Sequence, residues 1–172
     1  MKWALIIVGI LVGLLAVVWL IGAMLPQGHV ASRKVRLKQP PEAIWQAITD
    51  VEAMPSWRKD LKGIKRLPDK NGMPAWVETS GFGEMPLEVV EMAPPRRMVA
   101  KIADPKLPFG GTWTYEIAPA DGGATLTITE RGEIYPALFR FMSRFFFGYT
   151  STIEQYLKAL GKKFGEEAEP QP

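Results

Sequence analysis

The stretch PALFRFMSRFFFGYTSTIEQYLKALGKKF, from Pro136 to Phe164, carries apolar side chains at spacings of three and four residues. This spacing predicts one long helix whose apolar stripe must be buried against another element. The stripe consists of Phe139, Met142, Phe146, Tyr149, Ile153, Tyr156, Leu157, Leu160 and Phe164. A glycine inside a helix costs about 1 kcal/mol relative to alanine, so Gly148 predicts a kink.

The chain before this helix alternates between apolar and polar residues in short runs. Turn signals separate the runs, such as Asn71-Gly72 and Asp121-Gly122-Gly123. Strands joined by hairpin-length loops form antiparallel sheets. The predicted strands are residues 31–38, 61–67, 75–80, 85–92, 98–103, 112–117 and 124–133. The sequence therefore predicts an α+β domain, with a curved antiparallel sheet of about seven strands wrapped on the long C-terminal helix.

One or two further helices are predicted between the first and second strands. Pro41 suits the first turn of a helix that runs to about Asp50 and presents Ile44 and Ile48 on one face. The segment from Met54 to Trp57 predicts a break or a short second helix.

The N-terminal segment runs from Trp3 to Leu25 without a charged or amide side chain. As a helix it is about 34 Å long, enough to cross a hydrocarbon core of roughly 30 Å. A cleaved signal peptide is the alternative, but its apolar region would be shorter and would precede a small-residue cleavage site. The sequence favours a retained single-pass membrane anchor.

The side of the membrane on which the folded domain lies is left open. Arg33, Lys34, Arg36 and Lys38 follow the anchor, which favours the cytoplasmic side. Those residues lie in the first predicted strand, however, and whole domains can be translocated regardless of charge. The absence of cysteine removes any evidence from disulfides.

Composition narrows the classes of function. The chain has 21 Lys and Arg against 18 Asp and Glu, and no basic run interleaved with aromatics, so no nucleic-acid partner is predicted. It has no cysteine and one histidine, which argues against thiol nucleophiles, Cys/His zinc sites and Ser-His-Asp triads. No metal and no cofactor are predicted. His29, close after the apolar segment, is interpreted as a solvated residue of the membrane linker.

Four segments together resemble a known superfamily. They are PPEAIWQAITD (Pro40 to Asp50), MPSWR (Met54 to Arg58), PFGGTW (Pro108 to Trp113) and the closing helix. From Ala31 to Phe164 the chain is similar to the helix-grip or SRPBCC proteins, which include START domains and polyketide cyclase/dehydrases. The resemblance implies a hydrophobic small molecule or lipid held between the sheet and the closing helix. Enzymes are a minority in this superfamily, so the resemblance implies the fold of this chain more strongly than it implies any reaction.

Inward faces supply the candidate ligand-binding residues. Alternation places Trp113, Tyr115 and Ile117 on one face of their strand, and Ala124, Leu126, Ile128 and Glu130 on one face of the next. The candidate ligand-binding residues are Trp57, Arg58, Trp76, Met98, Trp113, Tyr115, Ile128, Met142, Phe146 and Tyr149. The alternative is that these side chains simply fill a core.

Few residues of the sequence are candidates for catalysis. Glu130 is the one carboxylate on an apolar face, and Arg58 is interpreted as its partner. Glu130 as general base and Tyr115 as a substrate-orienting group are the only catalytic candidates, and the sequence favours a binding domain over an enzyme. An enzyme of the cyclase/dehydrase sort and a ligand-free interaction module are the alternatives.

The predicted organisation has four parts. They are an anchor at 1–26, a linker at 27–30, a helix-grip domain at 31–165 and a disordered acidic tail at 166–172. Gly9 and Gly13 have the spacing of small-residue contacts between membrane helices, so a homodimer through the anchor is a further hypothesis.

Overall fold

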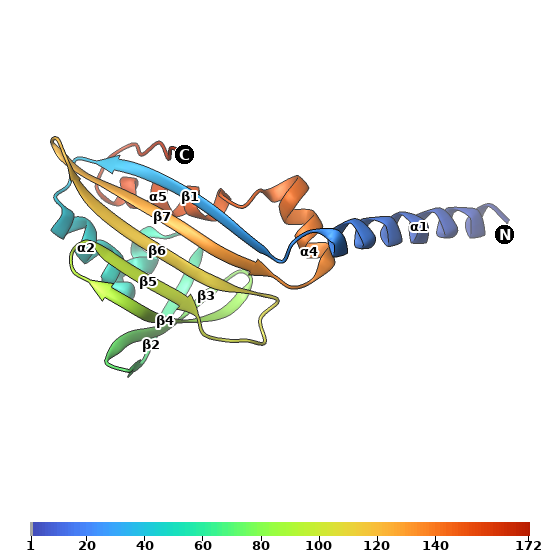
Figure 1. The fold of residues 1–172 in the computed structure, drawn as a ribbon, viewed down its shortest axis with the longest axis horizontal. Coiled ribbons are helices and arrows are strands. Elements are labelled where there is room, and N and C mark those ends of the chain that lie inside the picture. Colours follow the sequence, from blue (N-terminus) through green and yellow to red (C-terminus); the bar gives the residue numbers. More distant parts are fainter. Residues whose placement is uncertain (1) are drawn as a thin grey trace.

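The computed structural model describes residues 2–172 and consists of an isolated N-terminal helix and a folded domain. Helix α1, Lys2–Met24, projects from the domain along most of its length (Figure 1). Its side chains are almost all exposed, and Gly22 is its one buried residue. The helix is long and apolar enough to cross a membrane, a property that a signal sequence would share.

The seven predicted strands all form and join one antiparallel sheet in the order β1-β7-β6-β5-β4-β3-β2. Most of them extend slightly beyond their predicted ends. Their bounds are β1 Gly28–Leu37, β2 Leu61–Lys70, β3 Met73–Ser80, β4 Gly83–Ala93, β5 Arg97–Ile102, β6 Phe109–Ala120 and β7 Gly123–Ile134. The two outermost strands in the sheet, β1 and β2, are consecutive in the sequence but lie at opposite edges and do not pair with each other, so the sheet is open rather than closed into a barrel.

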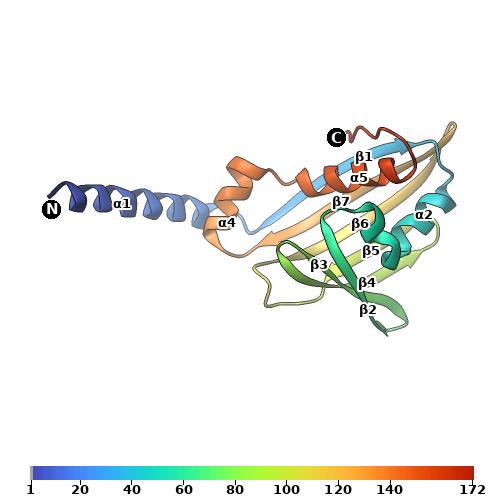
Figure 2. The ribbon, with the colours of Figure 1, turned by 180° about the vertical axis from the view of Figure 1, so that it is seen from behind.

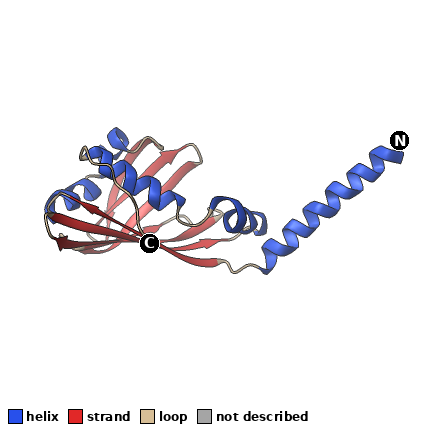
Figure 3. Ribbon diagram, turned by 90° about the horizontal axis from the view of Figure 1, so that it is seen from above, coloured by secondary structure: helices blue, strands red, loops and turns tan. Residues whose placement is uncertain are grey.

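Helices cover one face of this curved sheet (Figures 2 and 3). They are α2 (Pro41–Thr49), the single turn η1 (Val51–Ala53), α3 (Met54–Trp57) and α5 (Ser151–Lys163). Helix α5 buries Ile153, Tyr156, Leu157 and Leu160 against the sheet and exposes its opposite side. The α+β helix-grip fold is thereby confirmed.

The predicted long closing helix is broken into separate pieces. Helix α4 (Ala137–Met142) continues into one turn of π-helix, η2 (Ser143–Phe147), and α5 starts after a gap. Gly148 adopts φ 74° and ψ 168°, a conformation open to glycine and strongly unfavourable for other residues. The chain therefore changes direction at Gly148, and only α5 grips the sheet.

Both ends of the domain differ from the sequence prediction. Strand β1 starts at Gly28, so most of the predicted linker at 27–30 belongs to the sheet. The predicted disordered tail is ordered, since Gln171 exchanges two backbone hydrogen bonds of 2.8 and 2.9 Å with Lys34 on edge strand β1. Ala168 is buried, and the Glu166 carboxylate accepts from the backbone N–H of Lys38. The tail is ordered because it satisfies backbone groups that an edge strand leaves unpaired.

Candidate functional site

An aromatic cluster fills the space between α5 and the sheet. The Tyr156 ring of α5 lies at its centre, with ring-centroid distances of 5.4 Å to Trp57, 5.8 Å to Trp113 and 5.8 Å to Tyr115. The two tryptophans meet Tyr156 nearly edge to face, the arrangement that aromatic quadrupoles favour. The i, i+2 alternation of β6 puts Trp113 and Tyr115 on this side, as the sequence predicted.

A buried ion pair borders the aromatic cluster. Arg58 follows α3 and places its guanidinium carbon 5.2 Å from the centroid of the Tyr156 ring. It donates to Glu78 of β3 at 2.9 Å and to Asp60 at 2.7 Å. Burial acts to lower the pKa of Arg58, but the carboxylates of Glu78 and Asp60 outweigh it and the pKa is raised. Arg58 is therefore a permanent cation, already neutralised by two carboxylates.

Two buried donors of the cluster have no hydrogen-bond partner within residues 2–172. They are the Tyr156 hydroxyl and the Trp57 indole N–H. Burial raises the pKa of Tyr156 and the pKa of Tyr115, so both phenols stay protonated at neutral pH. Unpartnered buried donors are uncommon in proteins and are suited to an acceptor oxygen on a bound molecule.

A second polar group lies on the strands nearest α1. His29 Nε2 of β1 is 3.3 Å from Glu130 Oε1 of β7, and the His29 ring stacks on Tyr149 at a centroid distance of 4.2 Å. His29 Nδ1 and Glu130 Oε2 are buried without partners in the described chain. Burial raises the pKa of Glu130, against the opposing effect of His29.

Gly132 provides the room for this pair. It lies opposite His29 in the β1–β7 register, and a Cβ at Gly132 would overlap the His29 ring. Glu130 itself lies opposite Trp113 across β6 and β7. The His29–Glu130 pair and the aromatic cluster therefore belong to the same inner face of the sheet.

Most of the predicted site residues come together on this inner face. Trp57, Arg58, Trp113 and Tyr115 surround Tyr156, while Trp76, Met98 and Ile128 are buried in the adjoining core. Tyr149 packs beside the His29–Glu130 pair.

The structure contradicts four of the sequence interpretations. Phe146 does not face inward, since the break at Gly148 leaves its ring 68% exposed, and Met142 is only partly buried in α4. Arg58 does not pair with Glu130, because strand register brings Glu78 to Arg58 and His29 to Glu130. His29 is not a solvated linker residue, since its side chain is 11% exposed within the sheet.

Sequence reasoning also missed several residues of the site. Glu78 follows Trp76 at i+2 on the inner face of β3, and extending the alternation of β1 backwards from Val35 reaches His29. Both could have been found from the period of two. The apolar stripe of the closing helix includes Tyr156, but no local pattern indicates that its ring is the centre of the cluster.

Two hollows in the domain lie away from the aromatic cluster. A hollow of about 240 Å³ lies between α2 and the end of α5, lined by residues that include Gln46, Asp50 and Phe164. Another, of about 150 Å³, lies along β2 to β4 beside Met73 and Glu88. Neither touches the aromatic cluster, where rings occupy the space that the sequence suggested for a ligand. Within residues 2–172, no group of three or more His, Asp or Glu side chains is placed to hold a metal ion.

Comparisons with known proteins agree with this architecture. Residues 29–164 match the family described as polyketide cyclase / dehydrase and lipid transport. A START superfamily protein from Mycobacterium smegmatis superposes with a TM-score of 0.63 at 20% identity, over 78% of this chain and 96% of that one. A protein from Thermobifida fusca gives 0.61 at 20% identity, over 79% and 93%.

A further solved structure is larger than this chain. The di-domain ARO/CYC StfQ from the steffimycin biosynthetic pathway gives a TM-score of 0.63 at 14% identity, over 81% of this chain and 53% of that one. At such identities these likenesses establish the fold alone. No curated protein matches the sequence.

Proposed function

Because this chain belongs to the polyketide cyclase / dehydrase and lipid transport family, we propose that its domain binds a hydrophobic molecule between α5 and the sheet. The observation that carries the proposal is the aromatic cluster with its two unpartnered donors, Trp57 Nε1 and Tyr156 Oη. An apolar ligand would displace the rings from one another and accept hydrogen bonds from these two groups. The apolar wall supplies affinity, and the donors supply orientation.

The charges around the cluster favour a neutral acceptor on the ligand. Arg58 already has Glu78 and Asp60 as partners, so its positive charge is not free to bind an anionic ligand. An additional carboxylate would meet two existing carboxylates in a region of low dielectric constant. We therefore infer that the ligand offers a carbonyl, ether or hydroxyl oxygen rather than an anionic head.

Replacing Tyr156 by phenylalanine tests this arrangement. The change keeps the ring and removes the unpartnered hydroxyl, whose burial costs about 1–3 kcal/mol. We expect Tyr156→Phe to raise the melting temperature of the ligand-free protein and to weaken binding by roughly 2- to 10-fold, the value of one hydrogen bond. Thermal unfolding and titration with an apolar carbonyl-containing fluorescent probe measure the two effects on the full chain.

The matched control is Tyr135→Phe. Its hydroxyl donates to Glu133 at 3.0 Å on the surface, so neither the melting temperature nor probe binding should change. An unchanged probe affinity in Tyr156→Phe would show that the Tyr156 hydroxyl does not contact the bound molecule. Native mass spectrometry of the purified chain identifies any molecule that remains bound.

Membrane anchoring through α1 is the other part of the proposal. The Nε of Arg140 in α4 donates at 2.8 Å to the carbonyl oxygen of Gly22, near the end of α1, and this oxygen also accepts from the backbone N–H of Leu25 at 3.3 Å. A Cβ at Gly22 would overlap the Ala137 carbonyl, so the two backbones are in close contact. A cleaved signal sequence would need no such fitted contact with the domain, which supports a retained anchor. Neither contact favours one side of the membrane, or a dimer through Gly9 and Gly13.

The His29–Glu130 pair favours a second candidate function, an acid–base reaction on the bound molecule. Glu130 with a raised pKa next to an imidazole is suited to proton transfer, which contributes on the order of 10²–10⁴-fold to a rate. If the pair is catalytic, a compound in a membrane extract is consumed by the natural chain and spared by Glu130→Gln while binding persists. If the domain only binds, mass spectrometry finds the extract unchanged by either protein, and this is the result we expect.

A further inference from the structure

A continuous apolar surface lies outside the gripped part of the domain. Helices α4 and η2 expose an aromatic face, defined here as Leu138, Phe139, Phe145, Phe146 and Phe147, whose side chains are between 45% and 68% exposed. Phe141 lies behind them and contacts two of the rings, with centroids 4.9 Å from Phe145 and 6.1 Å from Phe146. The surfaces of soluble proteins rarely present so many large apolar side chains together. We therefore expect this face to be covered by a partner.

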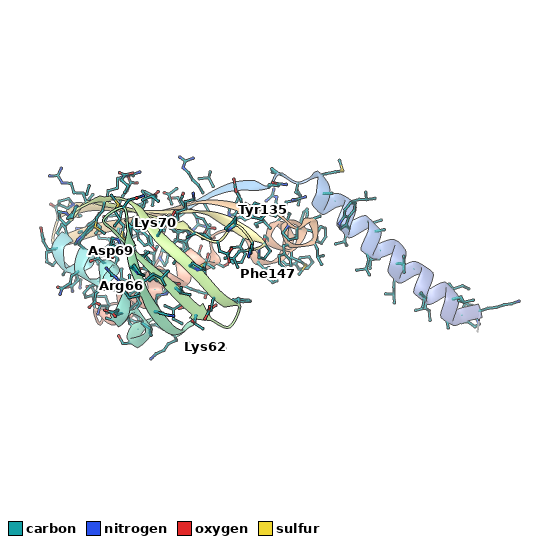
Figure 4. All side chains as sticks on the ribbon, turned by 90° about the horizontal axis from the view of Figure 1, so that it is seen from below. Lys62, Arg66, Asp69, Lys70, Tyr135 and Phe147 are labelled. Carbon is teal, nitrogen blue, oxygen red and sulfur yellow. The ribbon has the colours of Figure 1, made fainter. Side chains whose placement is uncertain are left out.

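The aromatic face is fixed beside the end of α1. Arg140 lies on the same short helix, and its guanidinium donates to Gly22 of α1 and, at 2.7 Å, to the Tyr135 carbonyl ahead of α4. Val18 and Gly22 on α1, and Leu25 just after it, are less exposed than their neighbours, which marks the side that packs on α4. Figure 4 shows Tyr135 and Phe147 close to α1, and Asp69 and Lys70 farther away. The aromatic face is therefore level with the last two turns of α1.

Sheet topology brings one more exposed aromatic side chain to this end of the domain. Because β1 starts beside α1 and all neighbours are antiparallel, the turn between β3 and β4 lies at the α1 end (Figure 1). Phe82 in that turn is fully exposed, at 101%. The same end of the molecule thus presents aromatic side chains from two separate parts of the chain.

We propose that the aromatic face and Phe82 lie in the surface layer of the bilayer that α1 crosses, which rests on the anchoring proposed above. A rigid contact with the last turns of a spanning helix puts neighbouring side chains at the boundary between headgroups and acyl chains. Phenylalanine and leucine side chains gain free energy there, as in interfacial helices. A lipid surface is favoured over a protein partner because α4, which carries part of this face, packs on α1, whose own side chains are apolar and exposed.

The aromatic face and the interior of the domain are close together along the chain. The break at Gly148 lies between the aromatic face and α5, and Tyr149, the next residue, stacks on His29 inside the domain. The chain that separates lipid from the interior is therefore short and includes a glycine.

The test measures the depth of single labels in the full chain. The natural sequence has no cysteine, so a fluorophore can be attached at one introduced cysteine at a time. The positions are Phe146→Cys and Phe82→Cys for the proposal, Leu15→Cys within α1, and Asp121→Cys at the opposite end of the sheet. Each variant is reconstituted in phosphatidylcholine vesicles with and without brominated acyl chains, which quench fluorophores that lie in the lipid.

We expect quenching at Phe146 and Phe82 to exceed that at Asp121 several-fold, with Leu15 quenched most. Equal quenching at Phe146, Phe82 and Asp121, with Leu15 quenched, would overturn the surface contact and leave the anchor standing. Quenching at Phe146 and Phe82 without quenching at Leu15 would support the contact and overturn the anchor. The label at Phe146 could also be quenched neither by the brominated lipid nor by iodide in the aqueous phase. That result would assign the face to a protein partner and overturn the proposal.

Discussion

Replacement of Glu78 by alanine is expected to destabilise the domain by about 3–5 kcal/mol, because it leaves the Arg58 guanidinium buried with one partner fewer. Glu78 is 5% exposed, and its carboxylate accepts from Arg58 at 2.9 Å and from the Trp76 indole at 3.4 Å. Asp60 is half exposed and compensates Arg58 only in part. Denaturant unfolding followed by tryptophan fluorescence measures the loss.

The control for this prediction is another carboxylate that pairs with an arginine. Asp69 accepts from Arg66 at 3.2 Å on the surface, so Asp69→Ala should cost less than about 1 kcal/mol. The double variant Arg58→Met, Glu78→Leu should recover much of the loss, since it removes both buried charges. If Glu78→Ala lowers the free energy of unfolding by no more than Asp69→Ala does, solvent reaches Arg58 and the Arg58–Glu78 pair is not enclosed.

The second large effect is expected at Leu157, whose side chain is fully buried where α5 packs on the sheet. Leu157→Ala should lower the free energy of unfolding by about 2–5 kcal/mol, through lost burial and the cavity left behind. Helix α5 also carries Tyr156, so the same change should loosen the aromatic cluster and shift the fluorescence of Trp57 and Trp113. Unfolding midpoints and native-state emission spectra measure the two effects.

Lys158→Ala is the matched variant on the exposed side of α5 and should change neither quantity. The two substitutions lie next to each other in the same helix, so helix propensity cannot account for a difference between them. A loss below about 1 kcal/mol in Leu157→Ala would show that α5 is only loosely held on the sheet.

The strands and most of the inner face were predictable because alternation is a local property. Trp113, Tyr115 and Ile117 share a face whatever the rest of the chain does, and in the structure that face lies in the core, with Trp113 and Tyr115 against Tyr156 of α5. The short helix that places Trp57 and Arg58 follows from its own proline and apolar residues. The family resemblance then supplied the one fact that periodicity lacks, which is how the sheet and the closing helix are arranged.

Tertiary structure alone decided which side chains meet. His29 and Glu130 pair because β1 and β7 are neighbours in a particular register, although the sequence separates them widely. Arg58 reaches Glu78 rather than Glu130 for the same reason, and the acidic tail is ordered because edge strand β1 offers it hydrogen bonds. Gly148 was predicted to kink a helix, but the direction of the chain beyond it depends on where α1 and the sheet hold α4 and α5. Periodicity determines which face a residue occupies, whereas partners depend on register and packing between distant segments, and no local pattern encodes those.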